Sequence, residues 1–507
     1  RSRGGRIVRQ RARAGSRDRV AQTERALALP IESVGSLLSR LSPNDFELNR
    51  PSATKESHMS HSLSALQSEL LSAKIDVLRV IYADIIGTVR SKDLLVSELD
   101  KISHGGPAFC QGVWVTTTQG GVLDGADVLS NGLEDFISQI VPGSWRALPW
   151  EPGVAFVVAG ANNPDGTPNP LSPRVLLERI MGEYAKLGYT PLVGPELEFY
   201  IADRDPEGGF SRALTQPGRV YTTGATVDPK GTFLHLLRML DQLRIGVFAG
   251  NHEFSPSQYE INIWHGEALD ACDRAFMLKA GVKDVIARVG QAATFAGKPW
   301  SDEGGSGFHL HMSLVDAQGE NLMHEGDQLS ALAQHMIAGI VEHAAALTAF
   351  CNPTINAFKR LGPDTLAPYR ANWGYDNRSA MLRVPPERGG GTRLEMRLGD
   401  GAANAYLMTA ALLAAGLDGI RRQLAAPPAA VGYSYEDESQ AVLPMNLGEA
   451  LDALRADSAL IDLLGGDLVN VFEVMKRDEI ERYTADVPDP TTRDVTAWEV
   501  REYFLDL

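Results

Sequence analysis

Four short segments of this chain, far apart in the sequence, alternate charged or polar residues with apolar ones. They are Val193–Ile201, Tyr259–Ile263, Phe308–Ser313 and Arg393–Leu398. Because successive side chains of a β-strand point to opposite faces of the sheet, each segment can bury its apolar residues in a core and present its polar residues on the other face. The pattern therefore predicts a sheet with one apolar face and one face lined by acids, histidines and arginines.

The predicted polar face is rich in carboxylates and imidazoles. Its members are Glu196, Glu198, Glu260, Asn262, His309, His311, Ser313, Arg393, Glu395 and Arg397, and Glu253 lies just before the second segment. Several carboxylates that converge in a low-dielectric site cannot all stay ionised without compensating positive charge. Divalent cations supply that charge, and oxygen-rich ligand sets favour Mg²⁺ or Mn²⁺ over zinc. The sequence thus predicts a metal-dependent enzyme.

Each motif has a simpler interpretation when it is considered alone. The Glu-x-Glu pair of the first segment is typical of a solvated strand face, and the His-x-His pair of the third often only satisfies hydrogen bonds. The Arg-x-Glu-x-Arg run of the fourth is most simply a surface ion-pair ladder of little energetic consequence. Four such segments in one chain, three of them joined to loops rich in glycine and proline, favour a functional site.

The loops around these segments complete a resemblance to a known family. The motifs that carry it are Gly194–Phe199, His252–Glu260, Gly305–Ser313, Asn352–Leu361, Asn377–Arg383, Arg393–Arg397, Asp400–Leu407 and Trp498–Phe504. In this order they resemble the signatures of the glutamine synthetase family, from about Leu63 to the C-terminus. The resemblance implies an α+β fold, with a small N-terminal β-grasp domain at 62–160 and a large catalytic domain at 170–507 that is built on a curved antiparallel sheet. The turn-rich segment 162–170 is the predicted boundary.

Local patterns predict the main elements. Helices are expected at 63–73, 94–102, 173–187, 231–244, 268–295, 328–350 and 404–424, and further strands at 77–83, 113–118 and 154–159. No internal repeat is visible.

The resemblance implies a role for each polar residue. One metal would be held beside glutamate and the amine by Glu198, Glu253 and Glu260, and a second against the ATP phosphates by Glu196, His309 and Glu395. Four arginines would be catalytic: Arg378 and Arg383 neutralise phosphate, and Arg360 and Arg397 clamp the amino-acid carboxylates together with Gly305 and His309. His311, Ser313 and Arg393 would lie near the nucleotide, although a surface salt bridge remains the alternative for Arg393.

The implied reaction is the ATP-dependent ligation of glutamate to an amine. Joining an amine to the side-chain carboxylate of glutamate is uphill in water, so the carboxylate must be activated, most simply as γ-glutamyl phosphate made from ATP. This step requires Mg²⁺ or Mn²⁺ on the phosphates and cationic side chains around the transferring group. A γ-glutamylamide, ADP and phosphate would be the products.

Three departures from the ammonium-using members bear on the amine. In the flap, Arg360–Pro368, Leu366 stands where those members have a glutamate that takes a proton from ammonium. Their Phe-Asp-Gly-Ser-Ser loop has no counterpart, the nearest stretch being Phe109–Val113, and Gly304 replaces the asparagine of their Asn-Gly-Ser-Gly motif. These losses favour the γ-glutamylamine branch of the family, which uses ethanolamine, polyamines or similar amines.

Other functions stay open at this stage. A true glutamine synthetase would result if Asp364, two residues before Leu366, takes the role of the flap acid. A catalytically silent relative should have lost metal ligands, yet all six are present. A guanidino kinase would also use ATP, Mg²⁺ and arginines, but the strand motifs match the amide ligase residue for residue.

Composition and charge limit the partners and the setting. The 507-residue chain carries a formal net charge of −16, which argues against nucleic acid, and no apolar run is long enough to span a bilayer. Residues 1–58 are rich in arginine and are expected to be a disordered extension. The three cysteines are scattered, which suits a reducing cytoplasm. The resemblance also implies a homo-oligomer, a dodecamer of stacked rings with each site between neighbouring subunits.

Overall fold

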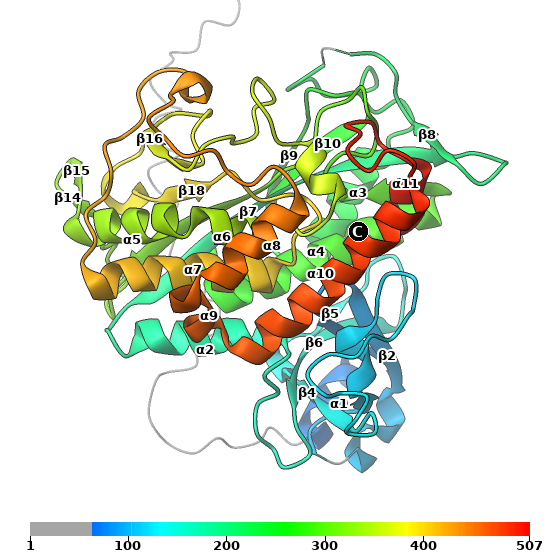
Figure 1. Ribbon diagram of the computed structural model, residues 1–507. Coiled ribbons are helices and arrows are strands. Elements are labelled where there is room, and N and C mark those ends of the chain that lie inside the picture. Colours follow the sequence, from blue (N-terminus) through cyan, green and yellow to red (C-terminus); the bar gives the residue numbers. More distant parts are fainter. Residues whose placement is uncertain (1–62, 103, 218) are drawn as a thin grey trace, which may run out of the picture. The chain divides into compact units, whose positions relative to one another are not determined.

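A computed structural model describes residues 63–507, apart from 103 and 218, and these residues belong to one compact unit (Figure 1). The arginine-rich leader predicted for 1–58 lies outside the described residues. Within the described part of the chain, no helix is long and apolar enough to cross a membrane.

The N-terminal part is a six-stranded sheet covered by one helix. Its strands follow the order β2-β1-β6-β4-β3, and β5 pairs with β6. The bounds are α1 Leu63–Ser72, β1 Val77–Ala83, β2 Val89–Leu95, β3 Ala108–Cys110, β4 Asp135–Ile140, β5 Arg146–Ala147 and β6 Val154–Asn162. Strand β6 is apolar on both faces because Ala155 and Val157 pack with α1, whereas Phe156 and Val158 join the main core.

The C-terminal part is built on a ten-stranded, mainly antiparallel sheet. Its path is β16-β17-β18-β13-β7-β10-β9, and β8, β11 and β12 also pair with β7. The bounds are β7 Thr190–Arg204, β8 Phe210–Arg212, β9 Val247–His252, β10 Gln258–Ile263, β11 Gly266–Glu267, β12 Gln291–Thr294, β13 Phe308–Val315, β16 Trp373–Tyr375, β17 Leu382–Val384 and β18 Leu394–Met396, and a separate hairpin joins β14 His324–Glu325 to β15 Gln328–Leu329. The predicted α+β class with a curved antiparallel sheet is confirmed.

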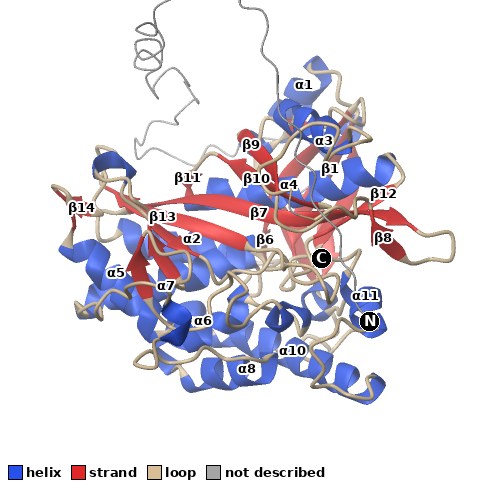
Figure 2. Ribbon diagram, turned by 90° about the horizontal axis from the view of Figure 1, so that it is seen from above, coloured by secondary structure: helices blue, strands red, loops and turns tan. Residues whose placement is uncertain are grey.

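Helices complete the C-terminal part, and the first three of them pack directly against strands of this sheet. They are α2 Pro173–Ala185, α3 Thr232–Gln242, α4 Ala268–Arg288, α5 Ala331–Glu342, α6 Ala344–Cys351, α7 Ala405–Arg422, α8 Leu447–Ala456, α9 Ser458–Leu464, α10 Gly466–Asp486 and α11 Ala497–Tyr503. Figure 2 shows that α5, α6, α7 and α8 lie on one side of the long strand β7. Leu197, Leu310 and Met396, from three of the four alternating segments, are fully buried in the shared core. The predicted apolar face is therefore present.

One predicted element in the N-terminal part is wrong, and another is shorter than expected. The strand expected at 113–118 is a 3₁₀ turn at Gln111–Val115, because Trp114 packs into an aromatic cluster with Tyr82 and Phe136. The helix expected at 94–102 begins only after β2 ends, and it is the 3₁₀ helix Val96–Lys101. In both places tertiary packing, rather than local periodicity, decides the backbone conformation.

Two predicted helices of the C-terminal part are too long. The helix expected at 268–295 ends at Arg288, since Gly290 has a left-handed φ of 80° and the buried residues that follow form β12 against β7. Short apolar runs of this kind are ambiguous between helix and strand. The helix expected at 328–350 is split into α5 and α6 at His343, and β15 precedes it.

A segment without strands or helices of its own follows the last strand of the N-terminal sheet. Strand β6 ends at Asn162 and α2 begins at Pro173, where Ser172 caps the helix by accepting a hydrogen bond from Val175 N–H. The division into domains at 62–160 and 170–507 stays a prediction.

Candidate active site

Strand register brings the four polar faces together around β7. Glu198 lies opposite Glu260 of β10, and Glu196 lies opposite both Asn262 of β10 and His309 of β13. On the far side of β13, His311 pairs with Glu395 of β18. The central position of β7 explains why its two glutamates meet residues from every other polar segment.

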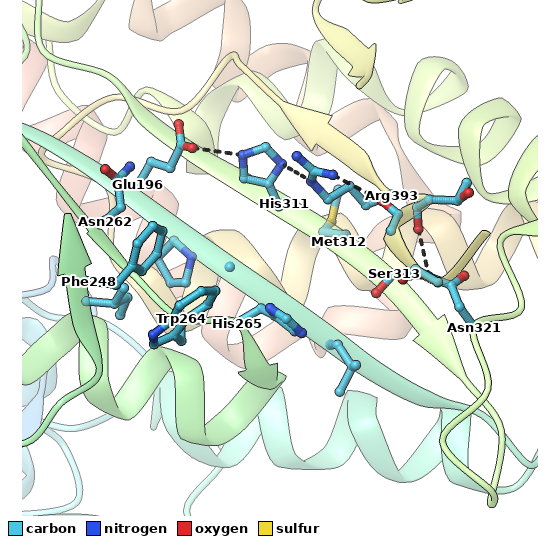
Figure 3. A pocket seen from close by; sticks show the side chains of 17 residues that line it. Glu196, Phe248, Asn262, Trp264, His265, His311, Met312, Ser313, Asn321 and Arg393 are labelled. Carbon is cyan, nitrogen blue, oxygen red and sulfur yellow. Dashed lines mark hydrogen bonds and ion pairs between the residues drawn. The ribbon is translucent and has the colours of Figure 1, made fainter. Parts of the chain in front are cut away.

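Glu196 is the common partner of the two histidines. His311 Nε2 lies 3.0 Å from Glu196 Oε1, and His309 Nδ1 lies 3.5 Å from Glu196 Oε2. Figure 3 shows Glu196, His311 and Arg393 in a row, in which His311 contacts Glu196 on one side and Arg393 on the other.

Two groups of side chains have ligand atoms close enough to share a cation. Glu196, His311 and Glu395 form one group, and Glu196, Glu260 and His309 form the other, with all ligand atoms of a group within 4.8 Å of one another. The predicted ligands are thus brought together, but in a different arrangement. His309 groups with Glu260, and His311, which was expected near the nucleotide, takes the place beside Glu395.

Neither predicted metal trio forms such a group among the described residues, since Glu196, His309 and Glu395 do not meet that limit together either. Within the described residues, Glu198, Glu253 and Glu260 do not form a group with all ligand atoms inside that limit. Their carboxylates nevertheless affect one another. Burial and the charges of Glu196 and Glu198 raise the pKa of Glu260 to about 9. Burial and Glu198 likewise raise the pKa of Glu253 to about 7. Carboxylates in such a setting ionise readily only beside a cation, so the donor set fits a hard divalent metal ion.

Glu198 is held by groups that the sequence analysis did not single out. Its Oε2 accepts hydrogen bonds from Gly307 N–H at 2.8 Å and from Gln258 Nε2 at 3.1 Å. The Gln258 amide also donates to the carbonyl of Gly305 at 3.0 Å. A signal for Gln258 was present in the sequence, since it precedes Glu260 by two residues and shares its strand face.

Glu395 is fixed between two arginines in the interior. Its Oε1 accepts from Arg397 Nη1 at 2.6 Å, its Oε2 accepts from Arg383 Nη1, and its residue is only 1% exposed. Burial alone would raise the pKa of Glu395, but His309 and Arg397, with weaker contributions from other cations, lower it to about 2. Glu395 and Arg397 of the Arg-x-Glu-x-Arg run are therefore part of a buried network with Arg383 and not of a surface ladder.

The remaining predicted arginines differ in exposure. Arg360 is 5% exposed, and its Nη2 donates to the carbonyls of Leu398, at 2.8 Å, and Gly399. The absence of a side chain at Gly305 makes room for it, because a Cβ there would lie 2.2 Å from Arg360 Cγ. Arg378 is exposed, and its carbonyl accepts from Arg397 Nε at 3.2 Å.

Arg393 combines the two roles weighed for it. Its Nε donates to His311 Nδ1 at 3.2 Å, and its Nη1 lies 3.0 Å from Glu387 Oε2. The ion pair with Glu387 is an exposed surface contact, whereas the bond to His311 reaches the cluster around Glu196.

A cavity of about 270 Å³ opens beside this cluster. It is lined by Leu192, Gly194, Pro195, Glu196, Phe248, Asn262, Ile263, Trp264, His265, His311, Met312, Ser313, Asn321, Gly390, Gly391, Thr392 and Arg393. Phe248 and Trp264 stack at one side of it, with ring centroids 4.3 Å apart (Figure 3). Sequence reasoning missed both rings, and their only signal is that they are large aromatic residues in polar surroundings.

The flap is tied to a later segment of the chain. Asp364 Oδ1 accepts a hydrogen bond from Tyr433 Oη at 2.6 Å, and the carbonyl of Ala367 accepts one from Tyr435 Oη at 2.9 Å. Asp364 and Leu366 have left-handed φ values of 64° and 61°, so this loop holds an uncommon backbone conformation. Leu366 is 49% exposed.

Comparison with known proteins gives a consistent result. Residues 170–503 match the catalytic domain of glutamine synthetase. A glutamine synthetase of Pyrococcus horikoshii is 34% identical over 447 residues, which cover 85% of this chain and 96% of the relative, and one of Halobacterium salinarum is 31% identical over 454 residues, or 87% and 96%.

Solved structures agree with the sequence relatives. An ADP complex of GmaS, a γ-glutamylmethylamide synthetase, has a TM-score of 0.74 and 31% identity over 86% of this chain and 98% of its own. A structure described as a novel glutamine synthase homolog has a TM-score of 0.73 and 25% identity over 85% and 99%. These similarities favour the amide ligase over the guanidino kinase and the silent relative. The chain is an ATP-dependent ligase that belongs to the glutamine synthetase family.

Proposed function

We propose that this protein is a glutamate–amine ligase that activates glutamate as γ-glutamyl phosphate and joins it to an organic amine, such as ethanolamine or a polyamine. The observation that carries the organic amine is Leu366, an exposed leucine at the flap position of an expected glutamate. An apolar flap lacks a proton acceptor for a small hydrated ammonium ion. It suits an amine whose own substituent fills the space.

The only nearby flap acid is already engaged by another side chain. Asp364 is hydrogen-bonded to Tyr433, and this contact directs its carboxylate towards the segment around residue 433. The similarity to GmaS supports an organic amine as well. The names of the curated relatives favour ammonium instead, and a true glutamine synthetase with Asp364 as its flap acid is therefore the second candidate.

Two cation sites are proposed on the polar face of the sheet. Glu196, Glu260 and His309 would hold one ion and Glu196, His311 and Glu395 the other, with Mg²⁺ or Mn²⁺ as the ions, and Glu198 and Glu253 would complete the first site. Divalent cations bound here would neutralise charge on the ATP phosphates during phosphoryl transfer. The residues themselves fix the geometry, because β7 holds Glu196 between the two histidines.

The nucleotide is proposed to occupy the cavity next to these sites. The stacked rings of Phe248 and Trp264 offer an aromatic surface for a base, and Ser313 and Arg393 line the same cavity. From there the phosphates would extend towards His311 and Glu196. The exposed Arg378 would meet the transferring phosphoryl group.

The reaction then requires two displacements. A γ-carboxylate oxygen of glutamate attacks the terminal phosphorus of ATP and releases ADP. The nitrogen of the neutral amine then attacks the acyl carbon, the bond to phosphate breaks, and the released phosphate carries away the proton that the nitrogen loses. Arg360 and Arg397 are proposed to hold the substrate's carboxylates. Planar guanidinium groups fixed by buried partners suit that role, because little conformational freedom is lost when the substrate binds.

The proposed setting is a cytoplasmic homo-oligomer, with a dodecamer of stacked rings as the expected assembly. Cys110, Cys272 and Cys351 are free thiols in the described structure, as a reducing compartment favours. Light scattering on the purified chain measures the assembly directly, and a fully active monomer would contradict it.

An acceptor screen tests the proposed function. Phosphate release from ATP is measured with glutamate alone and with glutamate plus ammonium, methylamine, ethanolamine, putrescine or spermine. We expect release that depends on both glutamate and an organic amine, with a higher kcat/KM for that amine than for ammonium. If ammonium is the best acceptor and Asp364→Ala abolishes its use, the protein is a glutamine synthetase.

A further inference from the structure

Asp400 and Arg360 form a buried pair behind the polar face. Asp400 follows β18 and is 0% exposed, and its Oδ1 accepts a hydrogen bond from Ala402 N–H at 2.8 Å. Its Oδ2 lies 3.6 Å from Arg360 Nε. Among the described residues, neither Oδ2 nor that Nε has a hydrogen-bond partner. Asp400 Oδ2 and Arg360 Nε therefore face each other without a hydrogen bond to any other described residue.

The rest of the Arg360 guanidinium is oriented by the same surroundings. Its Nη2 donates to the carbonyls of Leu398 and Gly399, which lie between β18 and Asp400. Its Nη1 forms no hydrogen bond with the described residues. Burial lowers the pKa of Arg360, and the charges of Asp400 and, more weakly, Glu198 oppose that effect.

The fold makes space for this pair at two glycines. A Cβ at Gly297 would lie 1.7 Å from Asp400 Oδ2, and a Cβ at Gly305 would lie 2.2 Å from Arg360 Cγ. Any side chain at either position would displace one member of the pair. Glycine is therefore required at 297 and at 305, where the backbone lies against Asp400 and Arg360.

Stability alone does not explain the pair. A buried ion pair gains little net free energy unless its geometry is excellent, because both charges lose their hydration. The same chain contains such a pair, Arg174 and Asp273, which bond in a bidentate manner at 2.9 Å and 2.9 Å. The contact of Asp400 with Arg360 is single and long. This geometry is poor for stability but keeps the guanidinium's remaining edge available.

We propose that Asp400 is a positioning residue that holds Arg360 in the orientation in which its guanidinium binds a carboxylate of glutamate. The inference rests on the proposed function, in which Arg360 clamps the amino-acid substrate. Asp400 does not touch the substrate. It balances the charge of Arg360 from behind and restricts the rotation of its guanidinium.

The test is a kinetic comparison of the wild-type enzyme with Asp400→Asn. Asparagine keeps the shape of aspartate and its bond to Ala402 N–H, but it removes the charge. We expect the KM for glutamate to rise about tenfold, since a charge-assisted contact is lost, while the KM values for ATP and the amine change less than about twofold. Thermal-shift titration with glutamate alone should show weaker binding, which gives a readout besides turnover.

Two further variants protect the test against a folding defect. Gly297→Ala should push the Asp400 carboxylate away from Arg360 while keeping its charge, and it should raise the glutamate KM in the same way. Asp273→Asn is the matched control, because its partners are Arg174 and Tyr406 on the helical side, and it should lower the melting temperature without changing the glutamate KM.

A double variant shows whether Asp400 acts through Arg360. In an Arg360→Lys background, Asp400→Asn should add little further increase in the glutamate KM. Unchanged glutamate KM in both Asp400→Asn and Gly297→Ala, or an equal rise for ATP, would overturn the inference. A wild-type enzyme without glutamate-dependent phosphate release would instead overturn the proposed function.

Discussion

Glu260 lies directly opposite Glu198 in the ladder between β10 and β7. Like charges at directly opposite positions of an antiparallel pair destabilise a sheet. Both carboxylates also point to the face that carries Glu196 and His309. The strand pairing therefore places repulsion where the proposed cation would relieve it.

We expect Glu260→Gln to increase stability and to remove function. Without metal, the neutral amide should raise the free energy of unfolding by about 1 kcal/mol, because the wild-type Glu260 must either stay charged beside Glu198 or take up a proton on folding. Glutamate-dependent phosphate release should fall at least about a hundredfold, since a proposed metal ligand is lost. Urea unfolding in EDTA and in excess Mg²⁺ measures the change in stability, and a phosphate-release assay with glutamate measures the loss of function. A variant that is less stable than the wild type in EDTA would contradict the explanation, and Asn262→Asp serves as a control that adds a charge to the same strand face.

Glu395→Ala should damage both stability and activity. Glu395 pairs with Arg383 and Arg397, so its removal leaves two buried guanidinium groups without their central partner. A loss of about 3–5 kcal/mol is typical when one partner of a buried ion pair is removed. Chemical denaturation of Glu395→Ala and Glu198→Ala compares the two losses of stability. In the wild type, Glu198 Oε2 accepts from a side-chain amide and a backbone N–H rather than from arginines, so Glu198→Ala should lose less. Both variants should lose product formation. Equal stability of the two would show that the arginines find other partners.

His343 should make stability depend on pH. Its Nδ1 lies 2.6 Å from Asp457 Oδ2 and its Nε2 lies 3.1 Å from Asp418 Oδ2, and the side chain is only 3% exposed. Although burial lowers the pKa of His343, the bonds to Asp457 and Asp418 outweigh it, and the pKa of the folded state is raised above 6.5. The stabilising contribution is therefore complete below about pH 6.5 and disappears as the pH rises through the folded-state pKa.

The corresponding experiment compares the wild type with His343→Gln in urea at several pH values. The difference in unfolding free energy should be largest near pH 6 and should shrink towards pH 9. Asp457 sets the lower limit of the pH range in which this contribution is present. Burial raises the pKa of Asp457, but the bond to His343 outweighs burial and the pKa is lowered overall. The stabilising contribution of Asp457 is therefore lost in acid. Arg422, which pairs with Asp418 at 2.7 Å, keeps its charge over this pH range, so its contribution to stability does not change with pH. A difference in unfolding free energy that does not vary between pH 6 and pH 9 would contradict the pH-dependent contribution of His343.

The strand faces of this site were predictable, but the partners across strands were not. Alternation within one segment fixes which residues share a face, so Glu196, Glu198, His309 and Glu395 were all expected on the polar side. Register between segments depends on loops far from those residues. This is why the pairing of His311 with Glu395 across β13 and β18 was not expected, although the charge of His309 also acts on Glu395.

The missed elements also have physical causes. Gly290 ends α4 because it adopts a left-handed conformation, which the periodicity of the helix does not reveal. Phe248 and Trp264 become a stacked pair only when β9 and the end of β10 are brought side by side. Local sequence patterns carry no information about such contacts between distant segments.

The flap provides the most direct test of the acceptor. If Leu366 marks a site for an organic amine, Leu366→Glu should raise the use of ammonium relative to that amine by about tenfold, because it restores an anionic proton acceptor. Leu366→Gln is the matched control, since it changes size and polarity in the same way without a charge, and it should leave the ratio nearly unchanged.

The switch should remain partial because a second anionic group of the ammonium-using enzymes has no counterpart near Phe109–Val113. Tyr433→Phe, which frees the Asp364 carboxylate from its hydrogen bond, should shift the ratio in the same direction but by less, since Asp364 lies two residues from the flap position. Ratios of kcat/KM for ammonium and for the preferred amine give the comparison. If neither Leu366→Glu nor Tyr433→Phe changes this ratio, the flap does not select the acceptor, and the specificity must come from another part of the site.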